Sequence, residues 1–286
     1  MGMAVSTGGE GRSRSVATWW RSRYGAQMLV EIGIVAALLM IYRQIRTVNK
    51  TDLTAAFANV RDIVRFESWL GMPFEDDLQA FLLDHPSLIK MLNHYYIWFH
   101  FPAAIGLLLW LYLRHSDRYR GFRNLMAFST FTGLIIHLLF PLAPPRMMDG
   151  FVDTMSRFGP NIYPDNPLEG AANQIAAMPS LHFAWAMIVA IAVISVLDSG
   201  WRWLIVVHPV LMTLSIIATA NHWWIDAAAA GLLVVAGIAL WRVLARWIGD
   251  RHWSWTAMRF ESDEGIRRLE QHANDARFES SDPNRR

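Results

Sequence analysis

The chain has 286 residues, of which 53% are hydrophobic and 14 are tryptophan, and its formal net charge is +2. This apolar fraction exceeds what a single soluble core needs and indicates an integral membrane protein. The basic residues are mostly arginines that adjoin apolar runs, a distribution that argues against nucleic-acid binding. Cysteine is absent, which excludes disulfides and any cysteine-based metal site or nucleophile.

The N-terminal part of the chain predicts a tail, one span and an interfacial region. Residues 1–24 are rich in Ser, Gly and Arg and lack a signal-peptide cleavage pattern, so we expect a disordered cytoplasmic tail. A first span is predicted at about 27–42. From 44 to 88, apolar residues recur near helical spacing among charges, which predicts one or two amphipathic interfacial helices.

Five further apolar runs complete a predicted bundle of six spans. Arginines 114, 118, 120 and 123 form a basic hairpin expected in the cytoplasm, and the acidic loop 143–175 is expected outside. A tight turn at 198–202 separates the fourth and fifth spans. Spans two to six are predicted at about 88–113, 125–140, 181–197, 203–219 and 223–241. The fold expected is an all-α polytopic membrane helix bundle with interfacial helices; its membrane domain covers 25–247, and a charged cytoplasmic tail covers 248–286.

A polar loop turns into a long apolar segment at residues 176–182 (AAMPSLH). Pro179 suits the first position of a helix, whose N–H groups have no intrahelical partner and attract anions. Ser180 adds a hydroxyl, and His182 adds a group that changes charge near neutral pH. Taken alone, the same residues also fit an ordinary helix cap with one chance histidine.

A second polar pair begins the last apolar run. His222 and Asp226 are four residues apart, so they share one helical face. A carboxylate at the edge of a membrane segment is costly unless it is paired. Asp226 could hold one nitrogen of His222 so that the other faces a reactant, and a purely structural pair is the alternative.

Together with Arg146, these segments resemble the type 2 phosphatidic acid phosphatase superfamily. The family motifs read K-x6-R-P, P-S-G-H and S-R-x5-H-x3-D. Arg146 matches the first motif, residues 179–182 the second, and Ser215, His222 and Asp226 the third. The chain departs from the motifs at Leu139 (Lys), Leu181 (Gly) and Ile216 (Arg). The P-P-R, AAMPSLH and N-H-x3-D segments, and residues 93–102 (NHYYIWFHFP), look like the inositolphosphotransferase branch; the likeness covers roughly 90–235.

The resemblance implies a membrane enzyme that transfers or hydrolyses a lipid phosphoester through a phosphohistidine, without cofactor or metal. It implies that His222 is the nucleophile, that Asp226 orients it, and that His182 is the acid for the leaving alcohol and then the base for the acceptor. Arg146 and Ser180 would hold the phosphoryl oxygens. His100, Asn93 and Tyr96 are candidates for binding a polyol or lipid acceptor. The partners expected are a lipid phosphate and the bilayer.

The expected location is the plasma membrane, with both termini cytoplasmic and the site extracytoplasmic. The sequence does not indicate an oligomeric state.

Other readings remain open at the level of the sequence. The enzyme could only hydrolyse a lipid phosphate or a polyprenyl diphosphate. His182, His222 and Asp226 could form a two-His, one-carboxylate metal site, although Arg146 would be a poor neighbour for a cation. The polar groups could line a transporter, although they fall at span ends rather than at the midplane. A di-iron desaturase does not fit, because His94 and His100 are six residues apart and no H-x2-H-H cluster exists.

Four aromatic or histidine residues have simpler expected roles. His137 and His208 are predicted to be packed or hydrogen-bonded within the bundle. Trp223 and Trp224 are predicted to be interface anchors, since aromatic belts mark that depth in a membrane.

Overall fold

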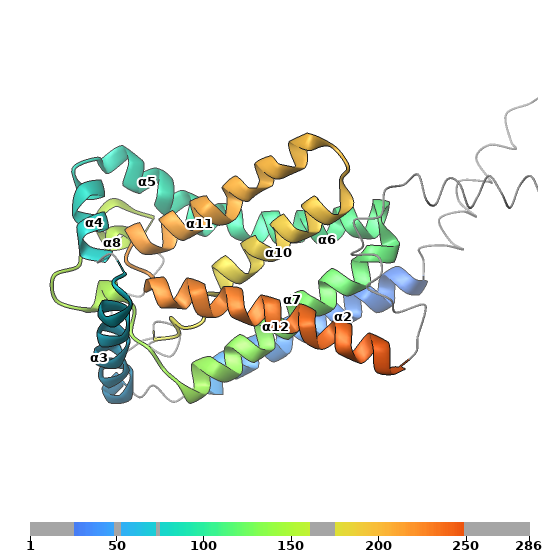
Figure 1. The fold of residues 1–286 in the computed structure, drawn as a ribbon, viewed down its shortest axis with the longest axis horizontal. Coiled ribbons are helices and arrows are strands. Elements are labelled where there is room, and N and C mark those ends of the chain that lie inside the picture. The colour runs from blue at the N-terminus through green and yellow to red at the C-terminus, as the bar shows by residue number, and fades with distance from the viewer. Residues whose placement is uncertain (1–25, 49–52, 73–74, 161–174, 249–286) are drawn as a thin grey trace, which may run out of the picture. The chain divides into compact units, whose positions relative to one another are not determined.

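The computed structural model describes residues 26–48, 53–72, 75–160 and 175–248. All regular structure in these ranges is helical, apart from one isolated parallel bridge between Leu142 and Ala176 (Figure 1). The prediction of an all-α membrane fold is therefore confirmed. The expected tails, 1–24 and all but the first residue of 248–286, lie outside the described residues.

The chain divides into two compact units, Met1–Asn49 and Lys50–Arg286. The first contains the helix α2 (Ala26–Val48), whose apolar stretch Leu29–Leu38 falls within the first predicted span. The second contains every other described helix.

Within the described residues, four helical segments are long and apolar enough to cross a membrane. They are Pro86–Arg114, formed by α5 (Pro86–His94), the π-helical turn η2 (Tyr95–Phe99) and α6 (His100–Arg114); α7 (Ser116–Leu139); Gly200–Ala218, formed by the 3-10 helix η4 (Gly200–Val206) and α11 (Val207–Ala218); and Trp224–Leu244 of α12 (Trp224–Ile248). The other two predicted spans correspond to shorter apolar helices, Leu29–Leu38 and α10 (Leu181–Val196).

Two predicted connections differ from those observed. The basic hairpin shrinks to His115 alone, because α7 already begins at Ser116 and takes in Arg118, Arg120 and Arg123. The expected tight turn at 198–202 is instead a short connection that leads into η4, where the Ser199 hydroxyl accepts the Trp201 backbone N–H. In both places helix continues where charged or small residues had suggested a loop.

Helix α10 is the centre of the bundle and contacts α6, α7, α11 and α12 (Figure 1). It is apolar all round, as expected of a helix surrounded by others. Alanines 184, 186, 190 and 192 are buried, and such small side chains let neighbouring helices approach closely. The first residue of α10 therefore has a well-defined position.

The helices α3 (Leu53–Leu70) and α4 (Glu75–Leu83) occupy the region predicted to be amphipathic. Together with the short helix α8 (Thr154–Phe158) they gather at one end of the bundle (Figure 1). The buried face of α3 is Ala56, Val60, Ile63 and Glu67, which follow helical spacing. A glutamate thus lies on the buried face, where the pattern would place an apolar residue.

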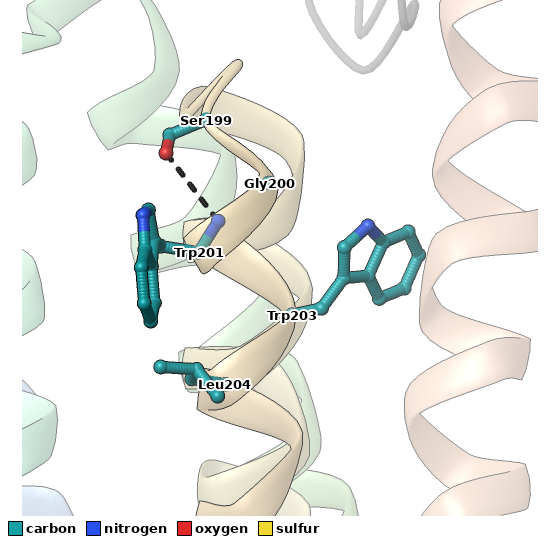
Figure 2. A pocket seen from close by; sticks show the side chains of 5 residues that line it. All are labelled: Ser199, Gly200, Trp201, Trp203 and Leu204. Atoms are coloured by element: carbon teal, nitrogen blue, oxygen red, sulfur yellow. Dashed lines mark hydrogen bonds between the residues drawn. The ribbon is translucent and has the colours of Figure 1, made fainter.

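A shallow pocket lies at the far end of α10, lined by Ser199, Gly200, Trp201, Trp203 and Leu204 (Figure 2). The two tryptophans project to opposite sides of η4, and the Trp201 N–H donates to the Ser199 hydroxyl over 3.3 Å. The exposed fractions of Trp201 and Trp203 are 78% and 56%. Exposed tryptophans beside a membrane helix are typical of interface anchors.

Two glycines allow α7 to pack closely against its neighbours. A β-carbon at Gly237 of α12 would lie 2.8 Å from side-chain atoms of Leu125 and Phe128. A β-carbon at Gly133 of α7 would lie 2.7 Å from Leu181 Cδ2. Leu181 stands where the family motif has glycine, so Gly133 provides the space that this larger side chain occupies.

We predict that Gly133→Ala lowers the stability of the protein because it overpacks Leu181, at a cost of about 1–3 kcal/mol that offsets the gain of about 1 kcal/mol in helix propensity. Gly106→Ala is the matched control, since nothing lies within 4 Å of a β-carbon there. Thermal unfolding in detergent should show a lower midpoint for Gly133→Ala than for Gly106→Ala, and Leu181→Ala should remove the difference. Equal midpoints for the two glycine variants would contradict this packing.

Candidate active site

Backbone hydrogen bonds join the segments that carry the three motifs. The Arg146 N–H donates to the Ala220 carbonyl over 2.8 Å, and the Ser180 N–H donates to the Asp226 carbonyl over 3.0 Å. The chain just before Arg146 also pairs with the chain just before Ser180, because the Leu142 N–H donates to the Ile175 carbonyl over 2.8 Å. The end of α7, the start of α10 and the connection between α11 and α12 therefore meet at one end of the bundle.

The His222 and Asp226 side chains form a buried pair. His222 Nδ1 lies 3.1 Å from Asp226 Oδ2, and the same oxygen accepts the Trp223 N–H over 2.9 Å. The exposed fractions of the two residues are 5% and 0%. Because Oδ2 accepts the backbone N–H, we assign the proton to Nδ1, which leaves the lone pair on Nε2.

The surroundings of His222 keep its imidazole neutral. Burial, followed by the positive charge of Arg146, lowers the pKa of His222 from 6.5 to about 3, against a hydrogen bond with the Ala177 backbone that acts in the opposite direction. A neutral imidazole retains the lone pair that a nucleophile needs. His222 would therefore be ready for attack throughout the neutral range.

Arg146 is positioned by the 3-10 helix η3 (Pro145–Met147) and by the chain just before His222. Its Nη1 donates to Asn221 Oδ1 over 3.1 Å. Asn221 is itself fixed, because its Nδ2 donates to Thr219 Oγ1 over 2.7 Å. Between these two residues, Ala220 adopts a positive φ of 56°, which a non-glycine residue rarely does. Arg146 is thus held beside the His222 loop through both its backbone and its side chain.

Ser180 is the N-cap of α10, and its hydroxyl oxygen accepts the Phe183 N–H over 3.4 Å. Leu181 is the first helical residue, so the prediction that Pro179 opens the helix is wrong: Pro179 precedes the cap. The Pro179 carbonyl oxygen lies 3.0 Å from His137 Nε2. The predicted structural role of His137 is thereby confirmed, since it holds the loop that leads into α10.

His182 belongs to a group of stacked rings beside the His222–Asp226 pair. Its ring centroid lies 6.2 Å from that of His222, 4.2 Å from that of Tyr96 and 4.4 Å from that of His100. Tyr96 and His100 come from the π-helical turn η2 and the first residue of α6, and π-turns often occur at functional sites. Through this turn Tyr96 and His100, which are four residues apart, both lie against His182.

His100 is buried between His182 and Trp185, whose ring stacks on it at 4.9 Å. Its Nδ1 is buried and has no hydrogen-bond partner among the residues that the structure describes. A buried polar nitrogen without a partner is costly, and such atoms call for an explanation. His100 and Tyr96 are therefore placed beside His182, as an acceptor-binding role would require.

Asn93 lies apart from this group. Its Nδ2 donates to the carbonyl oxygens of Thr154 and Gly159 over 3.0 and 2.9 Å, and its Oδ1 accepts the Thr154 hydroxyl over 2.9 Å. The amide is fully buried and ties α5 to α8. These bonds use the donors and acceptors that an acceptor substrate would need.

The positions at which the chain departs from the cationic residues of the family motifs bring no charged side chain to the site. Leu139, at the lysine position, is 79% exposed on the last turn of α7. Ile216, at the arginine position, is fully buried in α11. Of the Lys and Arg positions in the family motifs, the chain therefore retains the arginine at 146.

Of the two tryptophans predicted to be interface anchors, Trp223 differs from expectation. Trp223 is 3% exposed and donates its Nε1–H to the Ala143 carbonyl over 2.9 Å, so the prediction that it is an interface anchor is wrong. His208, by contrast, pairs with the Tyr95 hydroxyl, as a bundle histidine was predicted to do. The buried Trp223 ring, through its bond to Ala143, fixes the loop that precedes Arg146.

The sequence did not predict two buried glutamates, one in α3 and one in α4, that lie beside the start of α12. Glu75 Oε1 accepts the Trp224 N–H over 3.0 Å, and Glu67 Oε1 accepts the Ile225 N–H over 2.8 Å. The one available signal was that Glu67 falls in phase with the apolar face of α3.

A metal centre at this site was one of the alternatives left open. Within the described residues, no group of three His, Asp or Glu side chains is arranged to hold a metal ion.

The comparisons with known proteins agree with the motifs. Residues 61–240, more than half of the chain, match the family model of the PAP2 superfamily. No curated protein and no solved structure gives a significant match. The chain therefore belongs to the PAP2 superfamily, a family of lipid phosphatases and phosphotransferases.

Proposed function

We propose that the protein transfers a phosphoryl-containing group from a membrane lipid, with His222 as the nucleophile. The observation that carries the proposal is the buried His222–Asp226 pair, with Nδ1 and Oδ2 3.1 Å apart, next to Arg146 and 6.2 Å from the His182 ring. Nucleophile, orienting carboxylate, cation and second histidine are the groups that phosphoester cleavage requires.

In the first step, His222 Nε2 attacks the phosphorus of the donor. A P–N bond forms, and the P–O bond to the lipid alcohol breaks. Asp226 holds Nδ1–H and stabilises the positive charge that develops on the ring. Arg146, the Ser180 hydroxyl and the N–H groups of the first turn of α10 hold the phosphoryl oxygens. His182 donates a proton to the leaving alcohol oxygen.

In the second step, His182 takes a proton from the acceptor hydroxyl, whose oxygen attacks the phosphorus. The P–N bond breaks, and the neutral imidazole of His222 is restored. Water at about 55 M competes with any alcohol, so transfer requires that the acceptor is bound at a high effective concentration. Tyr96 and His100, beside His182, are the residues we assign to this task. Asn93 has no part in it, because its amide is committed to α8.

Transfer is favoured over hydrolysis by the ring group. A site that only hydrolysed lipid phosphates would not need a buried histidine with an unpartnered nitrogen next to the acid–base residue. We further propose that the chain belongs to the inositolphosphotransferase branch, which its P-P-R and AAMPSLH segments and residues 93–102 resemble. Its donor is then a lipid phosphoester, and its acceptor a polyol or another lipid.

We place the site at the extracytoplasmic face of the plasma membrane, with both termini in the cytoplasm. The arginines at the α6–α7 junction lie at the opposite end of α7 from Arg146, and basic residues mark the cytoplasmic side. An impermeant thiol reagent applied to a cysteine introduced at Asp149 tests this orientation.

Because His182 protonates the leaving group, its importance depends on the leaving oxygen. We predict that His182→Ala slows the first step, measured as the initial release of the leaving alcohol, by about 10²–10⁴-fold with an alkyl phosphate and far less with an aryl phosphate, since an aryl oxide leaves without protonation. His94→Ala, an exposed histidine on α5, is the control and should affect neither substrate. Equal losses on both substrates would show that His182 has another role.

The choice between transfer and hydrolysis is tested with a phosphatidate or phosphatidylinositol labelled at phosphorus. With a polyol or lipid acceptor present, we predict a labelled adduct. His100→Ala should lower the ratio of adduct to hydrolysis product, which is phosphate from phosphatidate and inositol phosphate from phosphatidylinositol, by about tenfold because the acceptor loses a contact. His222→Ala should yield neither product. Hydrolysis product released at the same rate with every acceptor, and without any adduct, would mean that the enzyme only hydrolyses its donor.

A further inference from the structure

Two carboxyl groups from α3 and α4 lie beneath the first turn of α12. Glu67 and Glu75 are 6% and 4% exposed, and they accept the N–H groups of Ile225 and Trp224. Asp226 accepts the preceding N–H, that of Trp223. Three consecutive N–H groups at the start of this helix therefore end on three carboxyl groups that come from three different helices.

The side chain of each glutamate affects the pKa of the other, and the charge of Asp226 raises the pKa of both. Among the described residues, no basic side chain forms an ion pair with either glutamate. A direct hydrogen bond between the two carboxyl groups requires one proton between them, because two carboxylates can only accept. Burial, with smaller contributions from Glu75 and Asp226, raises the pKa of Glu67 to about 8, against the Ile225 N–H, which lowers it. Burial likewise raises the pKa of Glu75.

The pair acts on the part of the helix that carries the proposed nucleophile. His222 lies two residues before α12. Asp226 lies in the first turn of this helix, where its carbonyl oxygen also accepts the Ser180 N–H. The orientation of this first helical turn therefore sets the orientation of the His222 and Asp226 side chains relative to His182. We propose that Glu67 and Glu75, as a carboxylic acid and a carboxylate that share one proton, are positioning residues that hold His222 and Asp226 in the reactive arrangement.

This inference rests on the proposed function for its effect on catalysis. Each glutamate gives one oxygen to the α12 backbone, and in this proposal the other oxygen faces the partner glutamate. Glutamine in place of Glu67 keeps this pattern, since its oxygen accepts the Ile225 N–H and its NH₂ donates to Glu75. Glutamine in place of Glu75 keeps it as well, because Glu67 can then be the acceptor. Glutamine at both positions sets two NH₂ groups against each other, and one backbone bond must be given up.

The test compares Glu67→Gln, Glu75→Gln and the double variant, with Asp77→Asn, an exposed acid of the same α4 turn, as the control. Each single variant should keep kcat within about threefold of the wild type, and the double variant should lose at least about tenfold in kcat with little change in KM, because positioning acts on the chemical step. A double variant with the kcat of the single variants would overturn the proposal.

The pH dependence of stability gives a second readout that needs no activity. A folded-state pKa of about 8, against 4.5 for an ordinary Glu, means that stability is lost as pH rises towards 8. Below pH 6.5 the lowered pKa of His222 works in the opposite direction, so the window to measure is pH 6.5 to 8. There, the unfolding equilibrium constant of the wild type should rise by up to about tenfold per pH unit, with a falling melting temperature, relative to Glu67→Gln.

The two hypotheses fail in different ways. If the wild type transfers no phosphoryl group to any acceptor or to water, the proposed function fails, and the melting comparison still decides the pairing. If the melting temperatures of the wild type and Glu67→Gln change in parallel from pH 6.5 to 8, no proton is shared and the proposal is overturned. If the double variant does not fold, the same comparison of wild type and Glu67→Gln remains the deciding measurement.

Discussion

The Asp226 carboxylate is completely buried at the first turn of a membrane helix, and the rest of the site depends on how this burial is compensated. A buried carboxylate is strongly unfavourable unless hydrogen bonds satisfy it. One oxygen accepts both the Trp223 N–H and the His222 imidazole. These two bonds fix the orientation of His222, so they serve both stability and chemistry. The other oxygen, Oδ1, is buried and has no hydrogen-bond partner among the described residues.

The helices act as a frame that brings the ends of distant segments together. Because α10 is surrounded by other helices and packed through small residues, its cap at Ser180 has a defined position, from which the Ser180 N–H reaches the Asp226 carbonyl. Arg146 is attached to the Ala220 carbonyl and to Asn221 in the same way. Polar groups at helix ends can be satisfied without disturbing the apolar centre, and this explains why the site lies at one end of the bundle.

The sequence predicted the helical membrane fold and the residues around His222, because hydropathy and i, i+4 spacing are local properties of the chain. It did not predict the glutamate pair, since Glu67 and Glu75 are separated by about 150 residues from the N–H groups that they accept. Trp223 was misassigned because composition gives the depth of a tryptophan but not which way it faces. Asn93 was grouped with Tyr96 and His100 through proximity in sequence, although the helix directs it towards α8 instead.

The central claim is that a covalent phosphoryl group forms on His222, and rapid quenching with a donor labelled at phosphorus tests it most directly. The account predicts an alkali-stable, acid-labile label that peptide mass spectrometry locates on His222, and that accumulates in His182→Ala with an aryl phosphate donor because the second step lacks its base. Asp226→Asn should reduce the label, and His222→Ala should abolish it together with turnover. Label on another residue, or normal turnover by His222→Ala, would contradict the account.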